Sequence, residues 1–137
     1  MPIFFFYGTL IDADVRAAVL DKFTDNGSVA PAQLEGWRRV GLHGRSYPVI
    51  VPSPDGTVDG IAASFAAGDE APVTERLKSF EGVEYIMAAV TLTSGDTASV
   101  FVGSRRCHPT GRAWSFSNWE RRHKRAFLTG IARGRLV

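Results

Sequence analysis

One glutamate stands where a carboxylate could become a proton acceptor. Glu81 follows Phe80 and precedes Gly82 at the end of a predicted helix. The partial negative charge at a helix C-terminus disfavours a second negative charge there, and the neighbouring phenyl ring would remove water from the carboxyl group. Both effects would raise the pKa of Glu81 and make its carboxylate a better general base. A surface glutamate beside a helix-ending glycine is the common alternative, and these residues alone leave both interpretations open.

A second segment that could bind a ligand or take part in a reaction is the turn Tyr7-Gly8-Thr9-Leu10, which joins an apolar strand to a helix. Such a turn directs backbone N–H groups and a helix N-terminus toward one point, where an anion or a developing oxyanion would bind. Glycine also occurs in strand-to-helix turns for its backbone geometry alone. For these four residues by themselves, the geometric explanation is the more common one.

Other reactive side chains are not arranged for catalysis or metal binding. Cys107 and His108 are adjacent, and neighbours in sequence seldom face each other as a nucleophile and its base must. His43 and His123 are far from them in sequence, so the histidines lack the spacing of zinc ligands. No Gly-Lys-Ser/Thr follows Gly8, so the turn is not a P-loop. We therefore expect no metal site.

The chain around these residues predicts strands and helices in a definite order. Hydrophobic periodicity and turn residues indicate strands over 2–7, 58–65, 85–93 and 98–103, further short strands from residue 29 onward, and helices over 13–23, 71–80 and 117–130. The order is β-α-β-β-β-α-β-β-α. Clustered strands with separate helices are typical of an α+β fold, here with a mixed or largely antiparallel sheet that we expect to close into a small barrel. The length and the lack of a linker indicate one domain over residues 1–137.

Capping residues predict where the helices begin and end. Asp12 is placed to accept hydrogen bonds from the first amides of the first helix. Gly82 is placed to end the second helix as a C′ glycine. Ser117, with Glu120 three residues on, is typical of a capping box for the last helix.

Composition indicates an ordinary globular protein. Hydrophobic residues make up 45% of the chain and charged residues 22%, which argues against disorder. Cys107 is the single cysteine, so no internal disulfide can form, and we expect a reducing, cytoplasmic compartment. The apolar start MPIFFFYGTL lacks the basic region and cleavage site of a signal peptide and is too short to span a bilayer. We expect no membrane association.

The net charge of +2 conceals an uneven distribution. Residues 1–104 contain 7 Lys or Arg against 13 Asp or Glu, whereas residues 105–137 contain 9 Lys or Arg against the single Glu120. A basic segment of this kind can bind nucleic acid or an acidic partner. A solvated, basic helix face is the simpler explanation, because no nucleic-acid-binding motif accompanies the charge. We therefore expect no nucleic-acid partner.

Five segments, in order along the chain, match the motifs of a known family. The first strand ends in FFYGTL, which fits a Tyr-Gly-Ser/Thr-Leu motif. The middle segment AQLEGWRRVGLHGRSYPVIVP fits a Gly-aromatic-Arg stretch with a following Tyr-Pro, and VDGIAASF fits a V-x-G strand. LKSFEGVEY fits L-x-x-F/L-E-G-x-x-Y, and the tail is WSFSNWERRHKRAFL. This ordered set, which covers nearly the whole chain, resembles the gamma-glutamylcyclotransferase-like (AIG2-like) family and, in its tail, the short bacterial-type members.

The resemblance implies a fold, a reaction and roles for residues. The fold is a compact α+β domain around a small β-barrel. In the reaction, the α-amine of a gamma-glutamyl group attacks its own side-chain carbonyl and releases 5-oxoproline with an amine or amino acid. The partner is thus a small gamma-glutamyl compound, and no metal or organic cofactor belongs to this chemistry. The motifs assign the role of general acid and base to Glu81, and they place in the substrate pocket Tyr7, Gly8, Thr9, Leu10 and Tyr85.

Alternatives stay open at this level. Glu84 is the second candidate for the catalytic carboxylate, Tyr85 could serve packing alone, and Arg45 and Tyr47 are candidates for positions near the pocket. A non-catalytic module that binds a small molecule on the same fold is the alternative function. The sequence predicts neither the leaving amine nor the oligomeric state.

Overall fold

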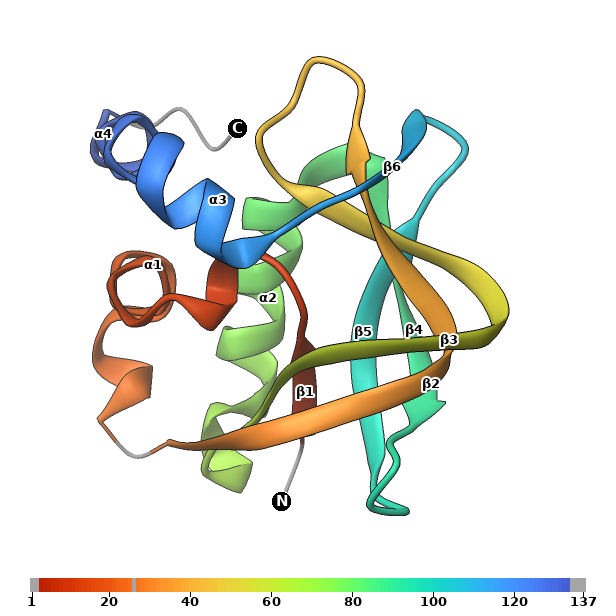
Figure 1. The fold of residues 1–137 in the computed structure, drawn as a ribbon. Helices are drawn as coiled ribbons and strands as arrows, with labels where there is room; N and C mark the ends of the chain where they lie inside the picture. The colour runs from red at the N-terminus through yellow and green to blue at the C-terminus, as the bar shows by residue number, and fades with distance from the viewer. Residues whose placement is uncertain (1–2, 26, 134–137) are drawn as a thin grey trace.

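The computed structural model describes residues 3–25 and 27–133 (Figure 1). In this part of the chain the strands are β1 Ile3–Phe6, β2 Ser28–Leu42, β3 Pro48–Ser64, β4 Tyr85–Thr91, β5 Thr97–Gly103 and β6 Pro109–Ala113. The α-helices are α1 Ala13–Leu20, α2 Glu70–Glu81, α3 Phe116–Arg122 and α4 Lys124–Ala132. Short 3₁₀ turns are η1 Thr9–Ile11, η2 Asp21–Thr24, η3 Ala67–Asp69 and η4 Gly82–Glu84. None of these helices combines the length and the hydropathy that a membrane crossing requires.

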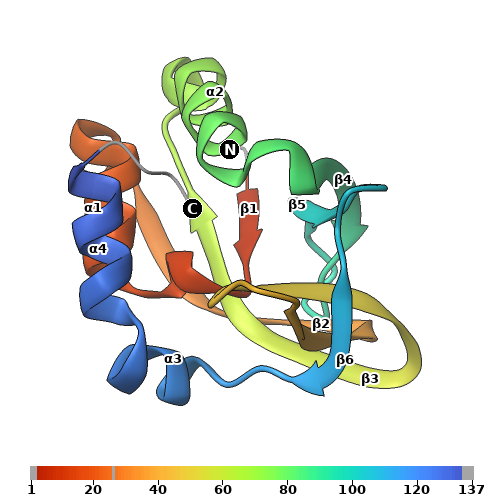
Figure 2. The same ribbon diagram turned by 90° about the horizontal axis from the view of Figure 1, so that it is seen from above.

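The strands form one mixed, curled sheet. Its order is β4-β5-β1-β3-β2-β6, in which β1 runs parallel to β5 and the other neighbours are antiparallel. The long strands β2 and β3 sweep around the others, while α1 and α4 lie together at one side of the molecule (Figures 1 and 2). The edge strands β4 and β6 do not pair with each other within the described residues, so the sheet is a half-barrel. The predicted α+β fold with a mixed sheet is confirmed.

The pair β2 and β3 replaces the several short strands expected in the middle of the chain. The two strands pair along nearly their whole length, with one register shift between Glu35 and Trp37. The expectation was wrong because Gly36 and Pro52 were taken as breaks between strands. Gly36, with a φ of 88°, lies at the register shift, which lets β2 continue past it as a bulged strand.

β1 lies between two apolar clusters, which explains its run of aromatic residues. The side chains on one face, Phe4 and Phe6, belong to the cluster that includes buried residues of α1, α2 and α3. Those on the other face, Phe5 and Tyr7, belong to a cluster formed with residues of the neighbouring strands. Because both faces of β1 are buried, its sequence is apolar throughout instead of alternating. The strand therefore places the turn that follows it inside the molecule.

Local capping signals set the ends of α1 and α2. The Asp12 side chain accepts hydrogen bonds from the amides of Asp14 and Val15, at 2.9 and 3.1 Å, which confirms the predicted cap. Gly82 ends α2 with a φ of 69°, a conformation that glycine adopts without strain, and this confirms the predicted helix stop. α1 ends at Leu20, earlier than predicted, and the 3₁₀ turn η2 continues the chain.

The C-terminal segment differs most from the prediction. Ser115, and not Ser117, caps α3 by accepting a hydrogen bond from the Asn118 amide at 3.2 Å, so the predicted capping box is wrong. The single helix expected here is divided at His123 into α3 and α4. β6 was not predicted, because its Pro- and Gly-containing sequence indicated a loop, and its pairing with β2 depends on residues far away in sequence.

Candidate active site

The turn after β1 contains backbone amides that have no hydrogen-bond partner among the described residues. In η1 and its flanks, the amides of Ile11 and Asp12 donate to the carbonyls of Gly8 and Thr9, each at 3.1 Å. Among the residues that the structure describes, the amides of Gly8, Thr9 and Leu10 donate no hydrogen bond. Successive free N–H groups of this kind can bind an anion or the developing oxyanion of a reaction.

Contacts from β3 and β2 hold this turn in place. A Cβ atom at Gly8 would lie 2.9 Å from Cδ of Pro48, so the close approach requires glycine. Arg39 on β2 donates from Nη1 to the carbonyl of Tyr7 at 2.8 Å. The guanidinium group of Arg39 in turn lies over the ring of Trp114, 5.3 Å from its centroid. The position of the amide donors is therefore fixed before any ligand binds, which is the condition for effective charge stabilisation.

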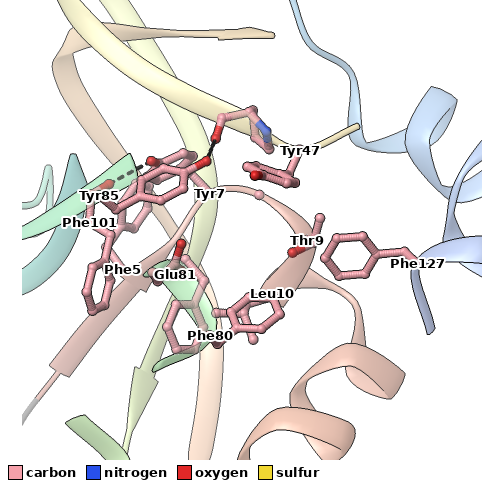
Figure 3. A pocket seen from close by; sticks show the side chains of 13 residues that line it. Phe5, Tyr7, Thr9, Leu10, Tyr47, Phe80, Glu81, Tyr85, Phe101 and Phe127 are labelled. Atoms are coloured by element: carbon pink, nitrogen blue, oxygen red, sulfur yellow. Dashed lines mark hydrogen bonds between the residues drawn. The ribbon is translucent and has the colours of Figure 1, made fainter. Parts of the chain in front are cut away.

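Two tyrosine side chains use their hydroxyl groups for backbone contacts. Tyr7 donates to the carbonyl of Phe101 at 2.6 Å, and Tyr85 donates to that of Pro48 at 2.5 Å (Figure 3). Burial raises the pKa of both hydroxyl groups well above the ordinary tyrosine value, so both stay protonated and keep these bonds. The hydroxyl protons of Tyr7 and Tyr85 are therefore used in hydrogen bonds within the protein. A ligand in the pocket would contact mainly the aromatic rings of these two side chains.

Glu81 is the last residue of α2, and its carboxyl group lies among aromatic rings. Figure 3 shows it pointing toward Tyr7 and Tyr85, with Phe80 beside it. Burial raises the pKa of this carboxyl group from 4.5 to about 8. The side chain is half-buried, so a ligand in the cavity can still reach it. A carboxyl group with this pKa can accept a proton and return it near neutral pH.

One pocket brings together all six residues that the sequence placed in the site: Tyr7, Gly8, Thr9, Leu10, Glu81 and Tyr85. The enclosed cavity has a volume of about 40 Å³ and opens to solvent. It can admit a small polar group, and the rest of a ligand would extend into the open part. The turn and Glu81 therefore face the same cavity, while the chemical roles of the six residues stay predictions.

The second candidate carboxylate is engaged outside the pocket. Glu84 accepts a hydrogen bond from the hydroxyl group of Tyr47, and its Oε1 lies 3.3 Å from Nε of Arg45 in an ion pair. Neither Glu84 nor Arg45 lines the pocket, whereas Tyr47 does. The geometry therefore favours Glu81 over Glu84 as the carboxyl group that meets a ligand.

The sequence did not reveal that Phe127 belongs to the aromatic wall of the pocket, whereas Tyr47, a candidate for a position near it, does line it. Phe127 on α4 packs against Tyr47 and Phe80, with ring centroids 6.4 and 6.0 Å apart. Trp119 on α3 is fully buried and packs against Phe127 at 5.6 Å. The spacing of Trp119 and Phe127 did indicate a less polar helix face. Which cavity that face covers depends on tertiary contacts, and no local pattern predicts it.

Other reactive groups lie outside the pocket. Cys107 and His108 do not line it, and burial raises the pKa of the Cys107 thiol, which lowers its thiolate fraction. No three His, Cys, Asp or Glu side chains in the described part of the chain lie close enough to hold a metal ion together. The pocket itself offers a proton-exchanging carboxyl group, amide donors and apolar walls. These groups suit a reaction in which a proton moves while negative charge develops on a carbonyl oxygen.

Known proteins are similar to this chain in sequence and in fold. A family model described as "Gamma-glutamyl cyclotransferase, AIG2-like" matches residues 4–121. The chain is 32% identical to "AIG2-like protein A" of Arabidopsis thaliana over 130 residues, which are 90% of this chain and 75% of that protein. A solution structure of an Arabidopsis thaliana protein is 30% identical, with a TM-score of 0.64 over 95% of this chain and 87% of the other. A structure titled "Gamma-glutamyl cyclotransferase" is 14% identical and similar in fold, with a TM-score of 0.59 over 78% of this chain and 68% of the other.

Proposed function

The chain belongs to the AIG2-like gamma-glutamyl cyclotransferase family, and from this premise we propose that it is a cyclotransferase with Glu81 as its general acid and base. In the proposed reaction, the α-amine of a gamma-glutamyl group attacks its own side-chain carbonyl, and the products are 5-oxoproline and a free amine or amino acid. The observation that carries the proposal is the pocket in which a carboxyl group of pKa about 8 and the free amides of one turn meet. The single cysteine fits a cytoplasmic enzyme.

The first step requires removal of a proton from the substrate. Free α-amino groups titrate at about 7.7–8.0, so the nucleophile is largely an ammonium ion at neutral pH. The pKa of Glu81 lies in the same range, so the proton can pass from the ammonium group to the carboxylate with little change in free energy. The neutral amine then forms the new C–N bond at the side-chain carbonyl carbon.

The second step requires stabilisation of the tetrahedral intermediate. Its oxygen carries a negative charge, and the amides of Gly8, Thr9 and Leu10 can donate hydrogen bonds to it. The protonated Glu81 then donates its proton to the leaving nitrogen as the original C–N bond breaks, and the ring nitrogen gives up its extra proton to the released amine. Because the reaction is intramolecular, holding the glutamyl chain folded between the turn and Tyr85 supplies much of the acceleration.

The test is replacement of the carboxyl group without a change of shape. A panel of gamma-glutamyl amides and dipeptides is assayed for release of 5-oxoproline by the wild-type protein and by Glu81→Gln. Glutamine cannot accept the ammonium proton, and general acid–base catalysis contributes about 10²–10⁴-fold, so we expect kcat to fall by at least that factor.

Glu84→Gln is the matched control, because it removes a nearby carboxylate that does not line the pocket. We expect it to retain most of the turnover, since glutamine can still accept the hydrogen bond from Tyr47. Normal turnover by Glu81→Gln would overturn the assigned role. Absence of 5-oxoproline with every compound, in a folded wild-type protein that still binds them, would instead identify a binding module.

A further inference from the structure

Arg39 on β2 does not line the pocket, yet its side chain contacts the turn that does. Its Nη1 donates to the carbonyl of Tyr7 at 2.8 Å and to that of Asp59 at 3.0 Å. Burial lowers the pKa of Arg39, but a guanidinium group stays charged at any pH at which a protein of this kind acts. The hydrogen bond to the turn is therefore charge-assisted, which makes it stronger than one between neutral groups.

The carbonyl of Tyr7 and the amide of Gly8 belong to one peptide group. This group is planar and trans, so its C=O and its N–H point in opposite directions. The C=O points toward Arg39 on β2, and the N–H therefore points away from β2. Among the described residues this N–H donates no hydrogen bond, and Gly8 lines the pocket. One end of the peptide group thus contacts a fixed positive charge, while the other end is free to bind a ligand.

A positive charge at the C=O end of this peptide group changes the N–H at its other end. A hydrogen bond to a carbonyl oxygen withdraws electron density from the amide nitrogen, because the C–N bond shares the electrons of the carbonyl group. The N–H becomes a stronger donor, as in other chains of hydrogen bonds whose members polarise one another. The oxygen of the tetrahedral intermediate, the Tyr7–Gly8 peptide group and the guanidinium group would form such a chain.

The position of Arg39 is fixed by a second aromatic contact. Trp114 lies against the guanidinium group, 5.3 Å from ring centroid to Cζ, and its own Nε1 donates to the carbonyl of Ser46 at 2.8 Å. The Nε atom of Arg39 is buried and has no hydrogen-bond partner among the residues that the structure describes. An unpaired buried N–H destabilises a fold and calls for an explanation other than stability.

We propose that Arg39 is a positioning residue of the active site, which orients and polarises the Gly8 amide through the Tyr7–Gly8 peptide group. This inference rests on the proposed function, in which the Gly8 amide donates to the tetrahedral intermediate. Arg39 itself does not touch the substrate. Its effect should therefore appear in the step in which charge develops on the oxygen, and not in the binding of the uncharged carbonyl group.

Replacement of Arg39 should lower kcat and leave KM nearly unchanged. Arg39→Met keeps a hydrocarbon side chain against Trp114 and removes the charge and the donors. Loss of one oxyanion donor costs about 10²–10³ in kcat, and here the donor is weakened but still present, so we expect a fall of about 10- to 100-fold. Arg39→Lys restores the charge and should recover part of the loss. Arg38→Met is the matched control, because Arg38 is the exposed neighbour on the same strand, and should leave both constants unchanged.

Nuclear magnetic resonance reports on the Gly8 amide without any turnover. In proton–nitrogen correlation spectra, the nitrogen resonance of Gly8 should move upfield in Arg39→Met, because the nitrogen loses the electron withdrawal caused by the guanidinium group. Arg38→Met should leave this resonance unchanged. The same spectra show whether each variant is folded. If Arg39→Met does not fold, Arg39→Gln gives the same comparison, since it has a neutral amide in place of the cation.

The two measurements keep this inference separate from the proposed function. Wild-type kcat in a folded Arg39→Met, or an effect on KM alone, would overturn the inference and leave the cyclotransferase proposal intact. Failure of the wild-type protein to release 5-oxoproline from any compound of the panel would overturn the proposed reaction. The Gly8 resonance would then still decide the inference: an upfield shift supports a polarised amide, and an unchanged resonance contradicts it.

Discussion

At the scale of single residues, the burial of Glu81 links the chemistry of the site to the stability of the fold. The folded-state pKa of about 8 lies above the ordinary 4.5, so the folded protein binds an extra proton between these values. The resulting stabilisation is fully present below pH 4.5 and is lost as the pH rises toward 8. A glutamine at the same position does not titrate and escapes this loss.

We therefore predict that Glu81→Gln changes the pH dependence of stability. The two proteins should have similar free energies of unfolding at pH 4.5. At pH 9 the variant should have a free energy of unfolding about 2–4 kcal/mol larger than that of the wild-type protein. This figure follows from about 1.36 kcal/mol per unit of pKa shift, reduced because solvent screens the half-buried side chain. Urea denaturation at pH 4.5, 7 and 9 measures the difference. Parallel stability curves for the two proteins would mean that Glu81 is ionised in the folded state at neutral pH.

Gly8 is a second residue whose replacement has a definite geometric consequence. A methyl group there would meet Cδ of Pro48 at 2.9 Å, so Gly8→Ala has to displace the turn or β3. We expect turnover to fall by at least about tenfold, because the amide donors move, and stability to fall by about 1–3 kcal/mol. Gly68→Ala is the control, since a Cβ there meets nothing within 4 Å. Full activity of the Gly8 variant would remove the turn amides from the mechanism.

At the scale of elements, the start of α1 connects three parts of the molecule. The Asp12 side chain caps the helix and also lies 2.8 Å from Nζ of Lys124 on α4. Asp12 directly follows η1, so the cap is continuous with the turn of the pocket. One buried carboxylate thus helps to hold the turn, α1 and the helix that carries Phe127.

Replacement of Asp12 separates its two roles. Asp12→Asn keeps an acceptor for the amides of Asp14 and Val15 but loses the charge that faces Lys124, whereas Asp12→Ala loses both. We expect the alanine variant to lose about 1–2 kcal/mol of stability and the asparagine variant clearly less, because N-cap hydrogen bonds carry most of such effects. Urea denaturation of both variants measures this. Equal losses would assign the effect to the ion pair instead of the cap.

The elements that the sequence predicted well are those defined by local signals. The cap at Asp12, the stop at Gly82 and the aromatic strand β1 each depend on a few neighbouring residues. β6 and the full length of β2 depend on pairing between distant segments, so prolines and glycines in their sequences indicated loops. The division of the last helix at His123 likewise has no local glycine or proline to mark it.

The same distinction applies to the candidate site. Tyr7–Leu10 and Glu81 belong to compact motifs, which the sequence displays. Tyr47 was a candidate for a position near the pocket and does line it, whereas Phe127 becomes a pocket residue only through the packing of α4. The part of the site that the sequence did not predict is therefore the contribution of the last helix.

At the scale of the whole molecule, part of the basic C-terminal segment helps to hold the last helix against the first. Lys124 forms ion pairs with Asp12 and Asp14, whereas Arg121, Arg122 and Arg125 are exposed. We predict that neutralising the three arginines together leaves turnover and melting temperature nearly unchanged. Filter binding to RNA and DNA at several salt concentrations tests the alternative. Tight, salt-sensitive binding that the triple variant loses would show a nucleic-acid function.

The pocket also constrains how the protein acquires activity as it folds. Its walls come from β1, β3, the end of α2, β5 and α4, and the hydrogen bond of Tyr7 to Phe101 alone joins residues 94 positions apart. Contacts between residues so far apart form late, because the chain must first lose the entropy of a long open loop before the contact stabilises it. A chain still emerging from a ribosome lacks the Phe127 wall until its last helix is synthesised. Catalytic competence should therefore appear together with the final native packing, and a refolding experiment that follows turnover would report on completion of the fold.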